Sequence, residues 1–172
     1  MSTPLPGRPA HDLELPLVSG ERWSLAEQRP ERFTLLVFYR GLHCPVCASN
    51  LSDLQRRLDR LDHLGVQVMT ASCDTLARAR ESVDEWGIDQ LNVGYDLRID
   101  EARSWGLYIS SSISEAEPDR FCEPGLFLIR PDRIVYAASV QSMPFARPHY
   151  DDLIDAIEYV LEHDYPPRGA VE

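Results

Sequence analysis

Hydrophobic and polar residues fall along the chain in blocks of different length and period. Phe33 to Tyr39 (FTLLVFY) is almost continuously apolar, as expected for a strand that is buried on both faces. The leucines that follow recur at three- and four-residue steps as far as Leu64, which predicts a helix, and Gly65 is placed to end it. Val66 to Ser72 then predicts a second strand.

The C-terminal half shows the same alternation of patterns. We expect a helix from Asp74 as its N-cap to about Trp86, a short strand at Leu91–Tyr95, a helical turn at Asp100–Gly106, strands at Leu126–Ile129 and Ile134–Val140, and an amphipathic helix from Tyr150. Residues 110–119 are polar and predict a loop. Strands that alternate with helices predict an α/β fold with a mostly parallel central sheet, to which the final hairpin adds an antiparallel edge.

The N-terminal part is Pro-rich, and we expect residues 1–16 to form a surface segment. Leu17 to Leu25 surrounds Ser19-Gly20, a turn signal, and predicts a small hairpin. A chain of 172 residues fits one domain of ordinary size. We therefore expect a single domain at residues 17–165, followed by a C-terminal tail at 166–172.

The charge balance changes the range of partners to expect. The net charge is −11, and all 17 basic residues are arginines. An acidic surface repels phosphate backbones and anionic lipid headgroups, so we expect neither nucleic acid nor membranes as partners. The N-terminus lacks the basic and apolar regions of a signal peptide, and the composition suggests a bacterial source. We therefore expect a cytoplasmic protein, in which stable structural disulfides are rare.

Two of the four cysteines form a Cys-x-x-Cys motif, with Cys44 and Cys47 directly after the first predicted strand and at the start of the leucine-rich helix. The first turn of a helix offers unpaired N–H groups and the positive end of the helix dipole, and both lower the pKa of a thiol. Pro45 suits this turn because it has no N–H. The motif therefore predicts thiol chemistry, with one sulfur attacking and the other resolving the product.

Two structural interpretations compete with this one. A zinc site needs four ligands, usually in two paired half-sites, but Cys73 and Cys122 are isolated and the five histidines are scattered. We therefore expect no metal. The pair could also be two unreactive buried thiols, which its position after a buried strand argues against. Cys73 itself, at the end of a strand, is most simply a small buried residue.

Longer segments resemble a known family. FYRGLHCPVC, followed by the leucine-rich helix, is similar to the peroxiredoxin-like branch of the AhpC/TSA family. LELPLVSGERWSL resembles the hairpin that these proteins place before it, and GVQVMTASCD resembles their second strand. EPGLFLIRPDRIVYAASVQSMPFARP resembles their closing hairpin and the segment before the last helix. The resemblance implies a thioredoxin-like, peroxiredoxin-type fold with an N-terminal β-hairpin and helices flanking a mixed sheet.

The motif departs from the family at two positions. Typical members carry a proline, a threonine and the peroxidatic cysteine, and these positions hold Arg40, Cys44 and Cys47 here. In the same register, the attacking cysteine of thioredoxins matches Cys44 and their resolving cysteine matches Cys47. The sequence therefore leaves the identity of the nucleophile open, although the position of Cys44 before the first helical turn predicts the more exposed and more acidic thiol.

The resemblance also suggests residues that support the pair. Arg147 matches approximately the arginine that peroxiredoxins hold near their cysteine, although a surface arginine is equally compatible with its position. Arg40 and His43 flank the motif and could favour a thiolate, or His43 could be an exposed loop residue. Thioredoxin-like proteins have a cis-proline before the strand that matches Leu126–Ile129, which predicts a cis bond at Pro124. Cys122 would then lie on the rim of the site as a third redox cysteine.

These features predict an antioxidant enzyme that reduces hydroperoxides through a sulfenic acid and an intramolecular disulfide, with an external thiol as electron donor. The resemblance implies no cofactor, and a homodimer is one assembly that the sequence leaves open. The alternatives are a thioredoxin-like reductase of disulfides, a non-catalytic redox sensor and a zinc-binding interaction domain. A glutaredoxin role fits less well, because the chain is longer than that family and shows no obvious glutathione-binding segment.

Overall fold

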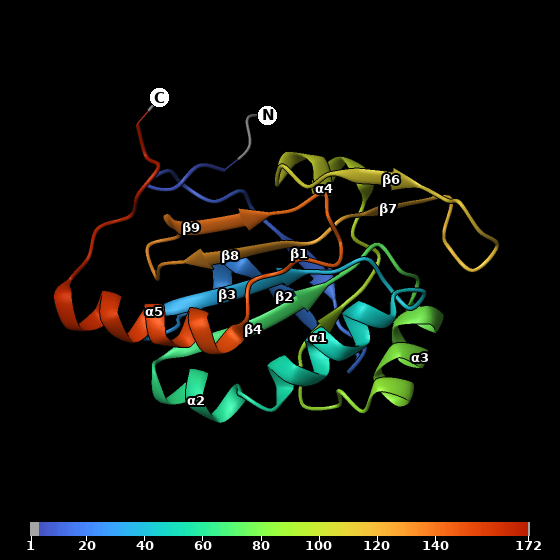
Figure 1. The fold of residues 1–172 in the computed structure, drawn as a ribbon, viewed down its shortest axis with the longest axis horizontal. Helices are drawn as coiled ribbons and strands as arrows, with labels where there is room; N and C mark the ends of the chain where they lie inside the picture. Colours follow the sequence, from blue (N-terminus) through green and yellow to red (C-terminus); the bar gives the residue numbers. More distant parts are fainter. Residues whose placement is uncertain (1–3, 172) are drawn as a thin grey trace.

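The computed structural model describes residues 4–171 and contains a five-stranded central sheet with helices packed on it (Figure 1). The strands are β1 (Glu14–Pro16), β2 (Arg22–Ser24), β3 (Phe33–Phe38), β4 (Val66–Ala71), β5 (Val93–Gly94), β6 (Ile109–Ser111), β7 (Arg120–Cys122), β8 (Gly125–Ile129) and β9 (Val135–Val140). The helices are the short 3-10 helix η1 (Leu25–Glu27), α1 (Pro45–Gln55), α2 (Leu58–His63), α3 (Leu76–Trp86), α4 (Ile99–Ser104) and α5 (Tyr150–His163).

The central sheet is mixed, with strand order β5-β4-β3-β8-β9. The β3–β4 and β4–β5 pairs are parallel, whereas β3–β8 and β8–β9 are antiparallel. The expected mostly parallel sheet is therefore wrong in its balance. The physical reason is that the closing hairpin inserts β8 directly beside the central strand β3, so antiparallel pairing reaches the middle of the sheet.

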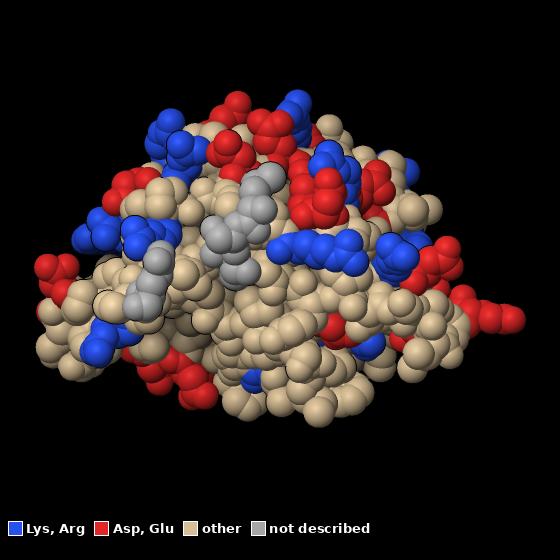
Figure 2. Space-filling model, turned by 90° about the horizontal axis from the view of Figure 1, so that it is seen from above, with Lys and Arg blue, Asp and Glu red and all other residues tan. Residues whose placement is uncertain are grey.

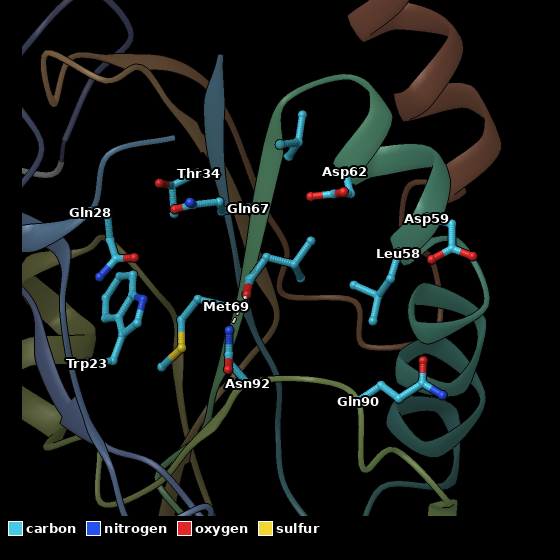
Figure 3. Close-up of a pocket in the computed structure, with 12 residues that line it drawn as sticks. Trp23, Gln28, Thr34, Leu58, Asp59, Asp62, Gln67, Met69, Gln90 and Asn92 are labelled. Carbon is cyan, nitrogen blue, oxygen red and sulfur yellow. Dashed lines mark hydrogen bonds between the residues drawn. The ribbon is translucent and has the colours of Figure 1, made fainter. Parts of the chain in front are cut away.

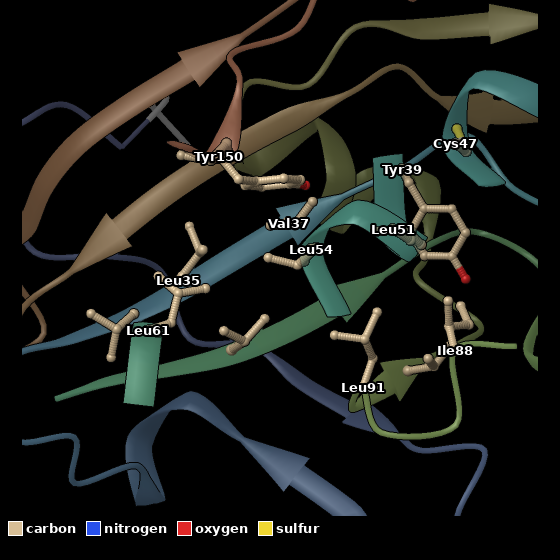
Figure 4. Close-up of a cluster of buried hydrophobic side chains, with 14 of the residues drawn as sticks. Leu35, Val37, Tyr39, Cys47, Leu51, Leu54, Leu61, Ile88, Leu91 and Tyr150 are labelled. Carbon is tan, nitrogen blue, oxygen red and sulfur yellow. The ribbon is translucent and has the colours of Figure 1, made fainter. Parts of the chain in front are cut away.

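Side chains of β3 alternate between two hydrophobic layers, because successive residues of a strand point to opposite faces. Leu35 and Val37 pack with Leu51 and Leu54 of α1 in the layer shown in Figure 4. Leu36 and Phe38 face the other layer, which includes Leu15 of β1 and Trp105 after α4. The strand is buried along its whole length, as its continuous apolar sequence predicts. Helices α1, α2, α3 and α5 lie along one side of the sheet in Figure 1.

The N-terminal hairpin begins earlier than expected. Strand β1 pairs with β2 from Glu14 onward, and Leu13 and Leu15 are almost completely buried, with 1% and 2% of their surfaces exposed. The prediction that residues 1–16 lie on the surface is therefore wrong for this stretch, and its first three residues lie outside the described part of the chain. The reason is the alternation of leucines at 13, 15 and 17, which carries a strand into the core despite the nearby prolines.

The leucine-rich segment forms two helices instead of one. Helix α1 ends at Gln55 and α2 begins at Leu58, with Arg57 outside helical geometry. Gly65 follows α2 with a φ of +74°, the left-handed conformation expected after a helix. The side chain of Arg57 bonds Asp53 of α1 at 2.5 Å and Asp151 of α5 at 2.6 Å, so the break places a cation between two helices.

Two further expectations change at helix and strand ends. The N-cap of α3 is Thr75, whose hydroxyl accepts the Arg78 N–H at 3.5 Å, and Asp74 has a different role described below. Gly87 ends α3 in the left-handed conformation, as predicted. Strands β6 and β7 enclose the expected loop and pair antiparallel, with Ile109 opposite Cys122. A short side sheet therefore stands where the polar sequence predicted only a loop.

Charged side chains of both signs share the surface. On the face seen in Figure 2, acidic side chains and arginines lie next to one another. Arg133, for example, is 2.9 Å from Asp12, although the two residues are far apart in the sequence. Within residues 4–171, no helix is long and apolar enough to cross a membrane.

Candidate active site

The cysteine pair lies where β3 passes into α1. Cys44 is the N-cap of α1, with extended backbone angles, and Pro45 occupies the first helical position. The Cys44 N–H donates to the carbonyl of Gly41 at 3.1 Å, so a turn leads the chain from the strand into the helix. The prediction that both cysteines sit at the N-terminus of the helix that carries Leu51 is confirmed.

The two sulfurs contact each other through the helix start. The Cys47 backbone N–H donates to the Cys44 sulfur at 3.2 Å, in the position of a capping bond. Both residues are free thiols, and both are buried, with 1% and 0% of their surfaces exposed. The expectation that Cys44 is the more exposed thiol is therefore wrong, because the chain around the helix start covers both.

The two thiols differ strongly in acidity. A hydrogen bond from the Cys47 thiol lowers the pKa of Cys44 to about 5 against the opposing effect of burial, and the Cys47 N–H, Arg147 and Arg40 act in the same direction. Burial, followed by the bond to Cys44, raises the pKa of Cys47. At neutral pH the pair therefore holds one thiolate, on Cys44, beside one protonated thiol.

Arg147 lies against both sulfurs. Its Nη2 is 3.2 Å from the Cys47 sulfur and 3.6 Å from the Cys44 sulfur, and its Nε donates to the carbonyl of Pro144 at 2.8 Å. It belongs to the segment between β9 and α5, about a hundred residues from the cysteines in sequence. The structure thus places this arginine where the family resemblance put it, with its positive charge over the thiolate.

Arg40 supplies a second guanidinium on the other side of Cys44, to which it hydrogen-bonds. Its Nε is 3.1 Å from the Glu123 carboxylate, its Nη2 is 3.9 Å from Glu117, and its guanidinium lies 5.0 Å from the centre of the Phe121 ring. Glu123 is itself almost fully buried. The carboxylates therefore hold Arg40 in place while its charge remains beside the thiolate.

His43 does not supply positive charge to the pair. Burial, followed by the positive charge of Arg40, lowers its pKa, so the imidazole is neutral at pH 7. The ring is half-buried, 4.5 Å from the Phe121 ring, and its Nδ1 is 3.5 Å from Nη2 of Arg78. It is therefore neither a cation that favours the thiolate nor the exposed loop histidine that was the alternative. Its place is in the packing around the loop.

Asp74 is a site residue that the sequence did not reveal. Its buried carboxylate accepts the N–H of Leu42 at 2.8 Å and Nε of Arg78 at 2.8 Å. Gly41 has a φ of +130°, and a Cβ there would lie 2.7 Å from the carboxylate. Asp74 therefore fixes the loop that precedes Cys44. One signal existed: Asp74 follows β4, the parallel neighbour of β3, and the carboxyl ends of parallel strands meet at one edge.

The expectations for Pro124 and Cys122 are wrong. Every peptide bond within residues 4–171 is trans, including the bond before Pro124. Its carbonyl accepts the Gln141 N–H at 3.0 Å, so the residue continues the β8–β9 pairing as extended chain and does not form the expected cis turn. Pro124 lines a small cavity of about 20 Å³ together with Arg147. Cys122 has no exposed surface and lies in the interior, not on the rim of the site.

A surface groove adjoins the site on the side of Arg147. Its volume is about 350 Å³, and its lining includes Val46, Phe145, Arg147 and Tyr150. Another groove, of about 490 Å³, is shown in Figure 3 between β2, β4 and α2, with polar residues such as Asp62 and Asn92 around it. That second groove contains no cysteine. Only the groove at Arg147 therefore connects with the chemistry described above.

A mixed sheet with a paired thiol site at the start of the helix after its central strand defines a thioredoxin-fold protein with thiol chemistry. The chain belongs to the AhpC/TSA family, whose model matches residues 6–138. No curated protein sequence matched the chain. The families of sequence and of fold therefore carry the identification.

Solved structures agree on the fold. AhpC from Enterococcus faecalis superposes with a TM-score of 0.75 at 20% identity, covering 95% of this chain and 98% of that one. Peroxidoxin BcpB from Mycobacterium tuberculosis gives 0.73 at 18% identity, with 91% and 98% covered. The thiol peroxidase from Chromobacterium violaceum gives 0.69 at 17% identity, with 95% and 89% covered. The expected peroxiredoxin-type fold is confirmed.

Proposed function

We propose that this protein is a thiol-dependent peroxidase that reduces hydroperoxides with the Cys44–Cys47 pair. The observation that carries the proposal is the Cys44 sulfur, which accepts the Cys47 N–H at the helix start and lies 3.6 Å from the Arg147 guanidinium. A thiolate is the form that attacks peroxides, and a cation beside it stabilises the negative charge that moves to oxygen. Membership of the AhpC/TSA family supports the same chemistry.

In the first step, the Cys44 thiolate attacks the terminal oxygen of the hydroperoxide. An S–O bond forms while the O–O bond breaks, and the departing alkoxide or hydroxide takes a proton and leaves as alcohol or water. Cys44 becomes a sulfenic acid, and the peroxide has gained two electrons. The Arg147 guanidinium, within reach of both sulfurs, is placed to hold the peroxide oxygens during this transfer.

In the second step, Cys47 resolves the sulfenic acid. Its sulfur attacks the Cys44 sulfur, an S–S bond forms, the S–O bond breaks, and water leaves with the Cys47 proton. Cys47 is suited to this role because its pKa is raised and its thiol already contacts Cys44. An external dithiol then returns two electrons and two protons to the pair by thiol–disulfide exchange.

Access to the buried sulfurs runs through the groove at Arg147. Phe145 is 72% exposed at this groove, and Val46 lies on its opposite wall at the start of α1. An apolar entrance next to a guanidinium suits a hydroperoxide with a hydrocarbon group, whose polar end would reach Arg147. We therefore expect organic hydroperoxides to be accepted as well as hydrogen peroxide.

A second candidate function is disulfide reduction, since the same Cys-x-x-Cys geometry at a helix start performs thiol–disulfide exchange. The trans bond at Pro124 weakens this candidate, because a cis-proline facing the cysteines was the expected element for binding a disulfide substrate. A sensor that is oxidised without turnover uses the same first two steps and differs only in lacking efficient reduction.

The test is a stopped-flow measurement of peroxide consumption by the pre-reduced protein and by Cys44→Ser and Cys47→Ser variants. We expect Cys44→Ser to lose the first step, with a rate about 10³-fold lower or less. Cys47→Ser should consume one equivalent of peroxide and then stop, with Cys44 trapped as a sulfenic acid. The opposite assignment of the two variants would make Cys47 the nucleophile, as the family register suggests.

Insulin reduction separates the two candidate functions. If the wild-type protein reduces insulin disulfides rapidly and barely consumes hydrogen peroxide or an organic hydroperoxide, the peroxidase proposal is overturned. Repeated peroxide turnover with a dithiol donor distinguishes an enzyme from a sensor, which would stop after one equivalent.

A further inference from the structure

The two remaining cysteines also form a pair. Cys73 follows β4 and Cys122 ends β7, yet the thiol and the backbone N–H of Cys122 both hydrogen-bond the Cys73 sulfur. The Cys122 sulfur is in addition 3.4 Å from the carbonyl oxygen of Tyr39. Both residues are free thiols. The folded chain therefore brings together two sulfurs that no sequence motif connects.

The members of this pair differ in access to solvent. Cys122 is completely buried in the core layer that contains Phe127 and Trp105, whereas Cys73 packs against that layer from outside and is partly exposed. The bond from Cys122 lowers the pKa of Cys73, and the bond to Cys73, followed by burial, raises the pKa of Cys122. An accessible acidic thiol in contact with a buried protonated one is the arrangement that dithiol oxidation requires.

The second pair lies close to the first but in a different layer of the core. Cys44 and Cys47 belong to the layer on the α1 side of the sheet, together with Tyr39. Cys122 belongs to the opposite layer and contacts the Tyr39 backbone. The charge of Cys47 contributes to the raised pKa of Cys122, so the two buried thiols are near enough to influence each other.

We propose that Cys73 and Cys122 are a second redox-active dithiol, which closes into an intramolecular disulfide when the reduced protein meets a hydroperoxide. The Cys73 sulfur attacks the terminal peroxide oxygen, the O–O bond breaks, and the alcohol or water leaves with a proton. Cys73 is then a sulfenic acid. The Cys122 sulfur attacks it, the S–S bond replaces the S–O bond, and water leaves with the Cys122 proton. Two thiols thus supply the two electrons that reduce one peroxide.

The test removes the first pair, so that its outcome does not depend on the proposed function of Cys44 and Cys47. A Cys44→Ser, Cys47→Ser double variant is reduced, freed of reductant and treated with one equivalent of hydrogen peroxide. Thiols are counted after denaturation, and the protein is cleaved at arginine for mass spectrometry. Cys73 and Cys122 fall on different peptides, because Arg78 and Arg120 lie between them.

We expect both thiols to disappear together, the two peptides to be linked with the loss of two hydrogen atoms, and dithiothreitol to restore them. Adding Cys73→Ser to the double variant should leave the Cys122 thiol unreacted, and adding Cys122→Ser should leave a sulfenic acid that a dimedone probe captures at Cys73. Near-ultraviolet circular dichroism checks that each variant is folded, and Cys73→Ser, at a partly exposed site, is the less disruptive of the two.

Three results would overturn the proposal. Both thiols could survive the treatment in the folded double variant. Cys73 could proceed to a sulfinic acid while Cys122 stays free. A non-reducing gel could show that the disulfide joins two chains instead of closing within one. A normal peroxidase activity of the wild-type protein together with any of these results would leave the first pair as the only redox site.

Discussion

The two cysteine pairs share an internal arrangement and differ in what surrounds them. In each, a buried thiol hydrogen-bonds the partner sulfur and makes that partner acidic: Cys47 does so for Cys44, and Cys122 for Cys73. Cys44, however, also caps α1, whereas Cys73 follows a strand. The pKa of Cys44 falls to about 5, and that of Cys73 falls less far.

The charges beside the pairs have opposite signs. Arg147 favours the Cys44 thiolate, while the carboxylate of Asp74 raises the pKa of Cys73 against the hydrogen bonds from Cys122. A bond between two thiols is therefore enough to make one of them acidic. The helix start and the neighbouring charge determine how far the acidity goes, and this is why we assign peroxide turnover to the first pair.

Replacing Arg147 should have the largest effect on the comparison. We expect Arg147→Gln to slow peroxide consumption about 10- to 100-fold, since a hydrogen bond to a charged group contributes about 1.5–3 kcal/mol. The pH midpoint for alkylation of Cys44 should rise, while that of Cys73 should not move. Rates of iodoacetamide labelling, followed for each peptide, provide the measurement. The exposed Arg168→Gln is the matched control, and an equal slowing there would contradict a specific role for Arg147.

The acidity of Cys44 also predicts how stability changes with pH. Its folded pKa is about 5, below its ordinary value of 9.0, so this stabilisation is complete above the unfolded pKa and is lost as pH falls through 5. Between pH 7 and 5, the reduced protein should lose about 2 kcal/mol more unfolding free energy than Cys44→Ser. Urea unfolding under reducing conditions measures the difference. Cys73→Ser should differ less from the wild type, and parallel pH curves for all three would refute the assignment.

Asp74 contacts both regions, and its neutralisation should affect them in opposite directions. In Asp74→Asn, the bond to the Leu42 N–H is weakened, so we expect a loss of about 1 kcal/mol in unfolding free energy and slower peroxide consumption. Cys73 should become more acidic, because the carboxylate that opposes its ionisation is gone. Labelling rates of Cys73 against pH test this second effect. Asp84→Asn, on the exposed side of α3, should change neither quantity.

The smallest effect is expected at Pro45. Its side chain is exposed at the first position of α1, and the backbone N–H that proline lacks has no partner within the helix. Pro45→Ala should therefore change the unfolding free energy by at most about 0.5 kcal/mol. It should also leave the alkylation midpoint of Cys44 nearly unchanged. A large shift of that midpoint would mean that the proline, and not the capping bond, sets the geometry of the pair.

Long periodic segments could be predicted from the sequence because their own side chains determine them. The continuous apolar run of β3 and the one-sided apolar pattern of α5 are two examples, and the position of Cys44 at a helix start followed from them. Short elements such as β6 and β7 could not be predicted in this way. They consist of three residues each, and it is their pairing with each other that defines them.

The supporting residues of the site depend on which chain segments meet. Arg147 was suggested by a family resemblance alone, whereas Asp74 and Glu123 were missed because their partners lie far away in the sequence. The predicted cis bond at Pro124 failed for the same reason, since pairing with Gln141 keeps this segment extended. The contact between Cys73 and Cys122 likewise arises only when β4 and β7 are brought together.

The capped thiolate also has a consequence for the direction in which electrons flow. Folding stabilises the reduced form of the first pair, because Cys44 is ionised at neutral pH, and any such stabilisation makes the corresponding disulfide a stronger oxidant. For a pKa of about 5, this raises the reduction potential at pH 7 by about 60 mV above that of a pair of ordinary thiols. The smaller shift at Cys73 raises its pair less. Electrons that enter at the partly exposed Cys73 would therefore pass downhill to the Cys44–Cys47 disulfide.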